Sequence, residues 1–119
     1  MTYFTNEEFQ CKCGQCPVKT VDPVLLSRLN GLRAEYGKAI YVTSGIRCEE
    51  QNRKVGGVND SAHLDGQAAD IFCTSSHDRW LLLSHAVGLF NRIGIGTTFI
   101  HLDVSEDHPK EVIWLYGAH

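Results

Sequence analysis

The sequence predicts one domain that combines α-helices with a β-sheet. Two long segments carry apolar residues at helical spacing, several short segments are rich in β-branched residues, and one segment alternates apolar and polar residues. The chain has 119 residues, of which 43% are hydrophobic and 21% charged, so it can bury one core but is too short for a second domain of ordinary size. We therefore expect a single domain over residues 1–119.

The first long helix is predicted from Pro23 to Tyr36. Asp22 is a favourable N-cap, Pro23 suits the first helical position, and Gly37 supplies the stop. This helix is expected to cover the sheet and to carry no chemistry. Its apolar face consists of Leu25, Leu29, Leu32 and Tyr36.

A second long helix is predicted from about His77 to Asn91. It follows two serines, Ser75 and Ser76, and its apolar residues recur at helical spacing. The predicted core face consists of Trp80, Leu83, Val87 and Phe90, with Leu82 and Ala86 beside it.

Two shorter helical segments are expected. Thr5 and Glu8 form a capping-box pattern, which favours a short helix near residues 6–9. A second short piece is expected over residues 49–54, before the pair Gly56-Gly57.

Four strands are expected, and one of them places chemically useful side chains together. Residues 39–43 and 68–73 read as strands from their composition, and residues 111–116 form a final short strand. Apolar and polar residues alternate along the segment 94–104, so three of its residues are expected to share one face of a strand. These are Phe99, His101 and Asp103.

Charge and composition exclude several classes of function. The net charge is −3 and no run of Lys or Arg occurs, which argues against nucleic acid as a partner. No apolar run approaches a membrane span, and the N-terminal residues do not form a secretory signal. We expect a monomer made in the cytoplasm, which another factor must release if it acts outside. Five cysteines leave at least one unpaired in any internal disulfide scheme, which fits a reducing compartment better than a secreted scaffold.

Three cysteines fall within six residues near the N-terminus: Cys11, Cys13 and Cys16. Such thiolates could form part of a structural zinc site, with a fourth ligand from Cys48, Cys73 or a histidine. The alternative is that they are reduced thiols that pack a tight loop. The sequence leaves both open.

A candidate catalytic metal site is centred on His63 and Asp70. A turn at Gly66 would bring this imidazole and this carboxylate together, although they are too far apart for one helical face. His101 would complete three ligands, and a catalytic zinc ion uses three protein ligands and keeps one position for water. A lone histidine is more often structural, but His63 and His101 both fall next to acids at the ends of predicted strands.

Other polar residues could complete an active site. Asp103 lies two residues after His101 and could take the proton of the water that zinc activates. Arg47 could bind a substrate carboxylate or steady a developing oxyanion, the alternative being a surface ion pair. Ser61 could bond the substrate backbone or cap the turn, and Asn52 is expected to be a structural hydrogen bonder.

These motifs together resemble a known family. The segments Thr43-Ser44-Gly45-Ile46-Arg47-Cys48, Ser61-x-His63-x-x-Gly66-x-Ala68-x-Asp70 and Ile100-His101-Leu102-Asp103 look like those of the zinc D-alanyl-D-alanine carboxypeptidase and L-alanyl-D-glutamate endopeptidase family, in its compact phage or bacterial form. The resemblance covers most of the chain. It implies the hedgehog/DD-peptidase α+β fold, a small mostly antiparallel sheet flanked by helices.

The resemblance also implies the chemistry. Zn²⁺ would bind His63, Asp70 and His101, Arg47 would face the substrate, and the substrate would be the peptide stem of bacterial peptidoglycan. The sequence departs from other branches of the family, which place an acid three residues before the last histidine ligand or a histidine two before it. Here those positions are Thr98 and Phe99. The base would then be Asp103, unless Asp103 only orients a ligand.

Two hypotheses from different classes follow. The first is a zinc peptidase that acts on the cell wall after release, as a phage endolysin or a wall-remodelling enzyme, by carboxypeptidase or endopeptidase cleavage. The second is a non-catalytic wall-binding or phage structural module that keeps the fold and the metal, which the unusual base position motivates.

Overall fold

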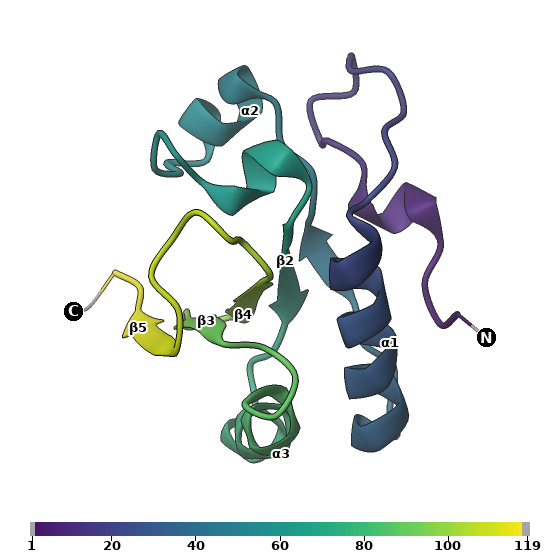
Figure 1. Cartoon of the computed structure of the whole chain (residues 1–119), viewed down its shortest axis with the longest axis vertical. Helices are drawn as coiled ribbons and strands as arrows, with labels where there is room; N and C mark the ends of the chain where they lie inside the picture. The colour runs from purple at the N-terminus through teal and green to yellow at the C-terminus, as the bar shows by residue number, and fades with distance from the viewer. Residues whose placement is uncertain (1, 118–119) are drawn as a thin grey trace.

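The structure is a computed structural model that describes residues 2–117. Its centre is a five-stranded sheet with the strand order β1-β2-β4-β3-β5 (Figure 1). Only β3 and β5 run parallel, and the other neighbouring strands are antiparallel. The strands are β1 (Val42–Ser44), β2 (Ala68–Phe72), β3 (Arg92–Ile95), β4 (Phe99–Asp103) and β5 (Val112–Leu115).

Helices flank this sheet. The two longer ones, α1 and α3, contact each other, and α2 and η2 lie at the end of the molecule opposite α3 in Figure 1. The sheet is mostly antiparallel and helices flank it, so the predicted α+β fold class is confirmed. The helices are α1 (Pro23–Tyr36), α2 (Glu49–Lys54), α3 (Ser76–Ala86) and the 3₁₀ helices η1 (Asn6–Phe9) and η2 (Ala62–Asp65).

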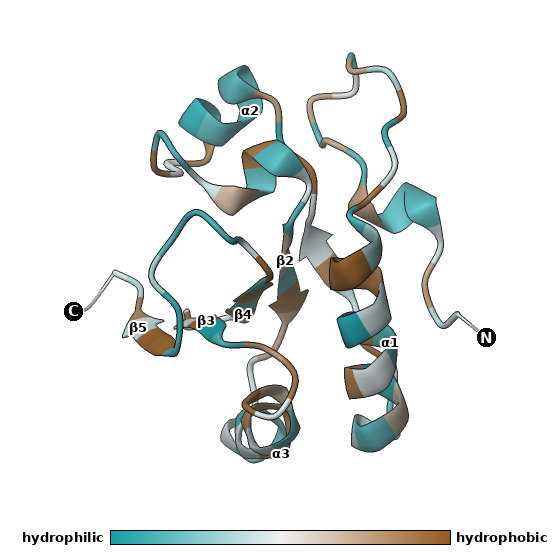
Figure 2. Ribbon diagram, in the orientation of Figure 1, coloured by the Kyte–Doolittle hydropathy of each residue, from teal (hydrophilic) through white to brown (hydrophobic). Residues whose placement is uncertain are grey.

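The two faces of the sheet have different partners because side chains alternate along each strand. One face carries Ala69 and Ile71 from β2, Ile100 and Leu102 from β4 and Ile93 from β3, all of them buried. They pack with apolar residues of the helices in one core. Figure 2 shows apolar segments on α1, β2 and α3, whereas α2 is largely hydrophilic. The opposite face is free to hold polar side chains.

The helix α1 forms as the sequence predicts. The Asp22 side chain accepts hydrogen bonds from the amides of Val24 and Leu25, and Gly37 ends the helix with a left-handed φ of 78°. The predicted residues Leu25, Leu29 and Leu32 are fully buried. The short helices η1 and α2 also form where they were expected, with the capping box of Thr5 and Glu8 at η1.

The second long helix differs from the prediction in length and in face. It ends at Ala86, five residues before Asn91. Gly88 lies in the turn that follows, and a glycine at that position would destabilise a continued helix. Its buried residues are Leu82 and Ala86, whereas Trp80 is 66% exposed. The prediction was therefore wrong for Trp80 and for Val87, which is 57% exposed, because the core face is centred on Leu82 and Ala86. Leu83 packs against the core as expected, and Phe90 is buried but lies beyond the end of the helix.

Two strand predictions also need correction. The segment 94–104 is not one strand but parts of β3 and β4, joined by a tight turn in which the Gly96 amide donates to the Phe99 carbonyl at 2.9 Å. The first strand spans Val42–Ser44 rather than residues 39–43, and its pairing with β2 has an irregular register between Val42 and Ser44. None of the helices in residues 2–117 has the length and apolar character needed to cross a bilayer.

Candidate metal centre

The polar face of the sheet aligns residues from four strands in one row. Asp70 on β2 pairs with His101 on β4, His101 pairs with Gly94 on β3, and Gly94 pairs with Trp114 on β5. Strand pairing therefore places a carboxylate beside an imidazole, although the two lie far apart in the sequence. Trp114 covers the same imidazole, with ring centroids 5.3 Å apart.

His63 reaches this row from outside the sheet. It lies on η2, which Ser61 caps by accepting a hydrogen bond from the His63 amide at 3.2 Å. Gly66 ends η2 with a left-handed φ of 69° and turns the chain into β2. Of the two roles considered for Ser61, capping the turn is the one that the structure displays.

Three ligand atoms converge at this point. His63 Nε2 lies 3.2 Å and His101 Nδ1 lies 3.0 Å from the same oxygen, Asp70 Oδ1. All three residues are buried, with exposed fractions of 2%, 4% and 8% for His63, His101 and Asp70. The predicted ligand set is thus brought together in the fold.

The outer nitrogens of both rings face acceptors that fix the tautomers. His63 Nδ1 lies 2.6 Å from the Gly45 carbonyl oxygen, and His101 Nε2 lies 2.6 Å from Asp103 Oδ2. Neither acceptor can donate, so each outer nitrogen carries the proton. In the neutral rings His63 Nε2 and His101 Nδ1 then present lone pairs to Asp70, and three acceptors meet without a donor.

The close approach of these groups shifts the pKa values of Asp70, His63 and His101. Burial tends to raise the pKa of Asp70, but the hydrogen bonds that His101 and His63 donate when their rings are protonated outweigh it and hold that pKa far below its ordinary value. Burial lowers the pKa of His63. Burial acts in the same direction on His101, yet Asp103 and Asp70 outweigh it and raise the pKa of that ring. The site therefore favours a positive charge between these atoms.

Arg47 is held against the same carboxylate. Its guanidinium donates to Asp70 Oδ2 at 3.0 Å, to Ser44 Oγ at 3.0 Å and to Asn52 Oδ1 at 3.2 Å. Asn52 in turn donates to the Val58 carbonyl, which confirms its structural role. Arg47 lines the cavity described below, so it is not a surface ion pair.

Asp103 lies behind His101 and is 1% exposed. Its Oδ2 accepts from His101, and its Oδ1 accepts from Arg92 Nε at 2.7 Å and from the Ser105 amide at 3.1 Å. Arg92 also donates to the Pro109 carbonyl, which fixes the loop after β4. Both oxygens of Asp103 are therefore engaged, a geometry that favours the orienting role over that of a free base.

A cavity of about 510 Å³ opens over these residues. Sequence reasoning missed several residues that line it: Arg92, His108, Trp114 and Tyr116. Alternation along β5 could have indicated that Trp114 faces the site, but nothing in the sequence locates His108, which bonds Ser105 and Asp60 from a loop. The ring of Tyr116 lies 6.2 Å from that of His101.

Gly94 makes room for the rings of Trp114 and Tyr116, which form an aromatic wall beside His101. A Cβ atom built on Gly94 would lie 2.5 Å from the Tyr116 ring and 2.7 Å from the Trp114 ring, closer than carbon atoms approach without displacement. The absence of a side chain at this position of the row lets both rings cover His101.

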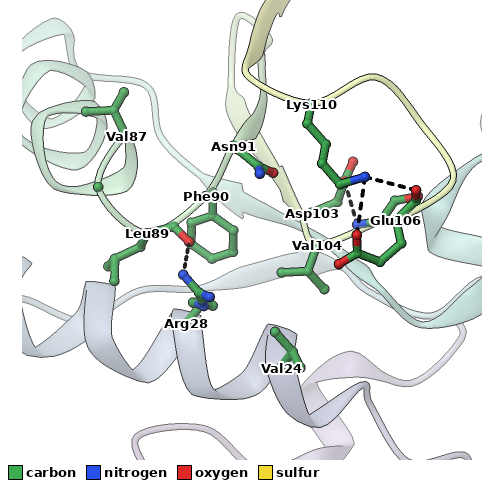
Figure 3. Close-up of a pocket in the computed structure, with 12 residues that line it drawn as sticks. Val24, Arg28, Val87, Leu89, Phe90, Asn91, Asp103, Val104, Glu106 and Lys110 are labelled. Atoms are coloured by element: carbon green, nitrogen blue, oxygen red, sulfur yellow. Dashed lines mark hydrogen bonds and ion pairs between the residues drawn. The ribbon is translucent and has the colours of Figure 1, made fainter.

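A smaller depression of about 210 Å³ lies between α1 and the loop after β4 (Figure 3). Its charged groups are already paired, since Arg28 donates to the Leu89 carbonyl and Lys110 pairs with Glu106. No histidine or cysteine of the described residues lines it. The larger cavity is therefore the better candidate site.

The fold and the site define a class: a small α+β domain with two imidazoles and a carboxylate at the base of a cavity. A family model described as Peptidase M15 matches residues 2–103. The chain thus belongs to the peptidase M15 family, as the resemblance predicted. A comparison with curated proteins found no match.

The donor set fits the zinc ion that is typical of this family. Zinc binds nitrogen and oxygen ligands at about 2.0–2.1 Å in tetrahedral geometry, which places ligand atoms about 3.3 Å apart. The separations of 3.0 and 3.2 Å around Asp70 Oδ1 are close to this value. The acceptors of the outer ring nitrogens, the Gly45 carbonyl and the Asp103 carboxylate, are the kind of outer partners that metal-bound imidazoles use.

Proposed function

We propose that the protein is a zinc-dependent peptidase that hydrolyses the peptide stem of bacterial peptidoglycan. The observation that carries the proposal is the convergence of His63 Nε2, Asp70 Oδ1 and His101 Nδ1 in a cavity of an M15-family domain. Zinc bound there would polarise a carbonyl and lower the pKa of water from about 15.7 to about 7. Cleavage follows either the D-Ala-D-Ala carboxypeptidase or the L-Ala-D-Glu endopeptidase pattern.

The residues of the chain have separate tasks in this proposal. Arg47 donates to Asp70 Oδ2 and orients that carboxylate, and its guanidinium lines the cavity where a substrate carboxylate or a developing oxyanion would lie. The wall formed by Trp114 and Tyr116 excludes water from one side of His101. Peptide stems carry carboxylates, and a guanidinium such as that of Arg47 binds carboxylates well.

Asp103 acts in this proposal through His101 rather than on the substrate. It accepts a hydrogen bond from the Nε2–H group of His101 and thereby keeps the Nδ1 lone pair directed at the ligand position. Its hydrogen bonds to Arg92 and Ser105 hold the carboxylate in place. This is the second of the two roles that the sequence left open.

The test uses purified peptidoglycan and the zinc-loaded protein, with mass spectrometry of the released muropeptides. We expect new products that a chelator abolishes and zinc restores, and the product masses identify the bond. A His63→Ala variant should yield none, whereas the matched control His77→Ala, at an exposed position outside the site, should cut normally. Products that persist in the His63→Ala variant would overturn the proposal.

A non-catalytic wall-binding module is the second candidate. Two observations favour it. Both oxygens of Asp103 are engaged, and Thr98 and Phe99 occupy the positions where other branches of the family place a base. In that case the zinc-loaded protein would sediment with cell walls and release no muropeptide. Chelator-sensitive hydrolysis excludes this candidate.

A further inference from the structure

Four cysteines gather at a second place in the fold, apart from the cavity. Cys11, Cys13 and Cys16 come from the loop after η1, and Cys48 comes from the N-cap of α2. One ligand atom from each lies within 4.8 Å of the others. Cys73, the alternative fourth ligand, lies outside this group and is buried near Ser75.

The spacing of the sulfur atoms suits a metal better than disulfides. Cys13 Sγ and Cys16 Sγ are 3.3 Å apart, and Cys11 Sγ and Cys48 Sγ are 3.8 Å apart. A disulfide needs about 2.05 Å, and all four residues are free cysteines. Tetrahedral zinc with Zn–S bonds of about 2.3 Å separates its sulfur ligands by about 3.8 Å.

Backbone amides point at these sulfurs. The amide of Cys48 donates to Cys11 Sγ, that of Gln15 to Cys13 Sγ and that of Gln51 to Cys48 Sγ, each at 3.4 Å. Such donors stabilise negative charge on sulfur, and a zinc ion requires thiolate ligands. The loop and the start of α2 together thus provide four ligands and three outer donors.

We propose that Cys11, Cys13, Cys16 and Cys48 bind a structural zinc ion, separate from the candidate catalytic ion. With four thiolates the site is closed, as structural zinc sites are, and it leaves no position for water. It resolves the choice that the sequence left open in favour of a metal, and identifies Cys48 as the fourth ligand.

The position of this site indicates which part of the fold the ion would stabilise. Cys48 follows Arg47 directly, and the preceding residues are held by η1, since the Ile46 amide donates to the Phe9 carbonyl at 2.7 Å. The same short segment contains Gly45, whose carbonyl accepts a hydrogen bond from Nδ1 of His63. A zinc ion that joins the N-terminal loop to α2 therefore stabilises the segment that orients both His63 and Arg47.

The test compares metal content and cobalt spectra of the whole chain, purified with reductant. Wild-type protein should hold one zinc more than the Cys13→Ala variant, and the control Cys73→Ala should retain the wild-type content. With Co²⁺ in place of zinc, wild-type protein should show sulfur-to-cobalt charge-transfer bands. The His63→Ala variant should keep these bands, because it removes only the imidazole site.

The outcomes separate this proposal from the proposed function. Bands that are absent from both wild type and His63→Ala would overturn the structural site, whether or not peptidoglycan is cut. Equal zinc contents of wild type and a folded Cys13→Ala variant would do the same. If Cys13→Ala does not fold, the cobalt spectrum of His63→Ala decides the question in a chain whose cysteines are all intact.

Discussion

Substitution of Asp103 by Asn tests how the site controls the tautomer of His101. The aspartate accepts hydrogen bonds on both oxygens, from His101 on one side and from Arg92 and Ser105 on the other. Asparagine keeps the shape but has only one acceptor oxygen, because the other position becomes an NH₂ donor. Two donors on the Arg92 side favour the oxygen there, so the NH₂ group faces His101.

This orientation reverses the protonation of the ring. Nε2 of His101 must then accept, and the proton moves to Nδ1, the atom that faces Asp70. An Nδ1–H group cannot bind a metal, so the variant must first restore the other tautomer against its surroundings. Loss of an outer partner of a metal ligand costs about 10- to 100-fold in affinity, which corresponds to about 1.4–2.7 kcal/mol.

The assay is a zinc titration against a chromophoric chelator, together with long-range ¹H–¹⁵N NMR of the histidine rings in the metal-free protein. We expect the weaker affinity and, at a pH above the raised pKa of His101, where the ring is neutral, a shift of its proton from Nε2 to Nδ1. Asp65→Asn is the matched control, since Asp65 lies on η2 but is exposed. Wild-type zinc affinity and tautomer, combined with lost hydrolysis, would refute the reasoning and make Asp103 the base.

Four further predictions concern the cavity, the core and pH. Gly94→Ala should displace the rings of Trp114 and Tyr116, shift tryptophan fluorescence and lower kcat/KM. The control Gly88→Ala, whose added Cβ would lie 3.6 Å from its nearest neighbour, should leave fluorescence and kinetics unchanged. Unchanged kinetics for Gly94→Ala would contradict the role of the two rings. Arg47→Lys should lower kcat/KM by about 100-fold, since a lysine cannot keep three directed hydrogen bonds, and steady-state kinetics on muropeptides that give wild-type values would argue against a role in the reaction. Leu29→Ala, at a fully buried position, should cost about 2–5 kcal/mol in denaturant unfolding, and a loss below about 1 kcal/mol would mean that the core relaxes around the gap. The raised pKa of His101 keeps its ring protonated at a higher pH than the ring of a free histidine, so zinc must displace a proton and the zinc affinity should rise with pH through that pKa. Calorimetry in buffers of different ionisation enthalpy should detect the released proton. If no proton is released, the ring of His101 is already neutral before zinc binds.

Local chemistry explains which parts of the fold the sequence predicts well. The N-cap, proline and glycine around α1 act within one turn of the helix, so its bounds could be predicted to the residue. The end of α3 depends on how Phe90 returns to the core after Ala86, a long-range contact that periodicity does not report. The division of residues 94–104 into two strands likewise depends on pairing with β2 and β5.

For the site, sequence by itself determined the residue types that carry the chemistry. The spacing around Gly66 and the alternation along β4 depend on local geometry, so His63, Asp70, His101 and the three clustered cysteines could be singled out from the chain alone. The fourth cysteine stayed one of several choices. A residue whose partner is distant in sequence leaves no local pattern by which to recognise it.

Only the tertiary structure decided which groups meet. Antiparallel pairing of β2 with β4 sets Asp70 against His101, and the parallel strand β5 brings Trp114 over the same ring. It also decided that Asp103 points at the back of His101 and that Cys48, not Cys73, joins the thiol cluster. The physical reason is that hydrogen bonds, metal ligation and desolvation act over a few ångströms in space, whereas the sequence orders residues only along the chain.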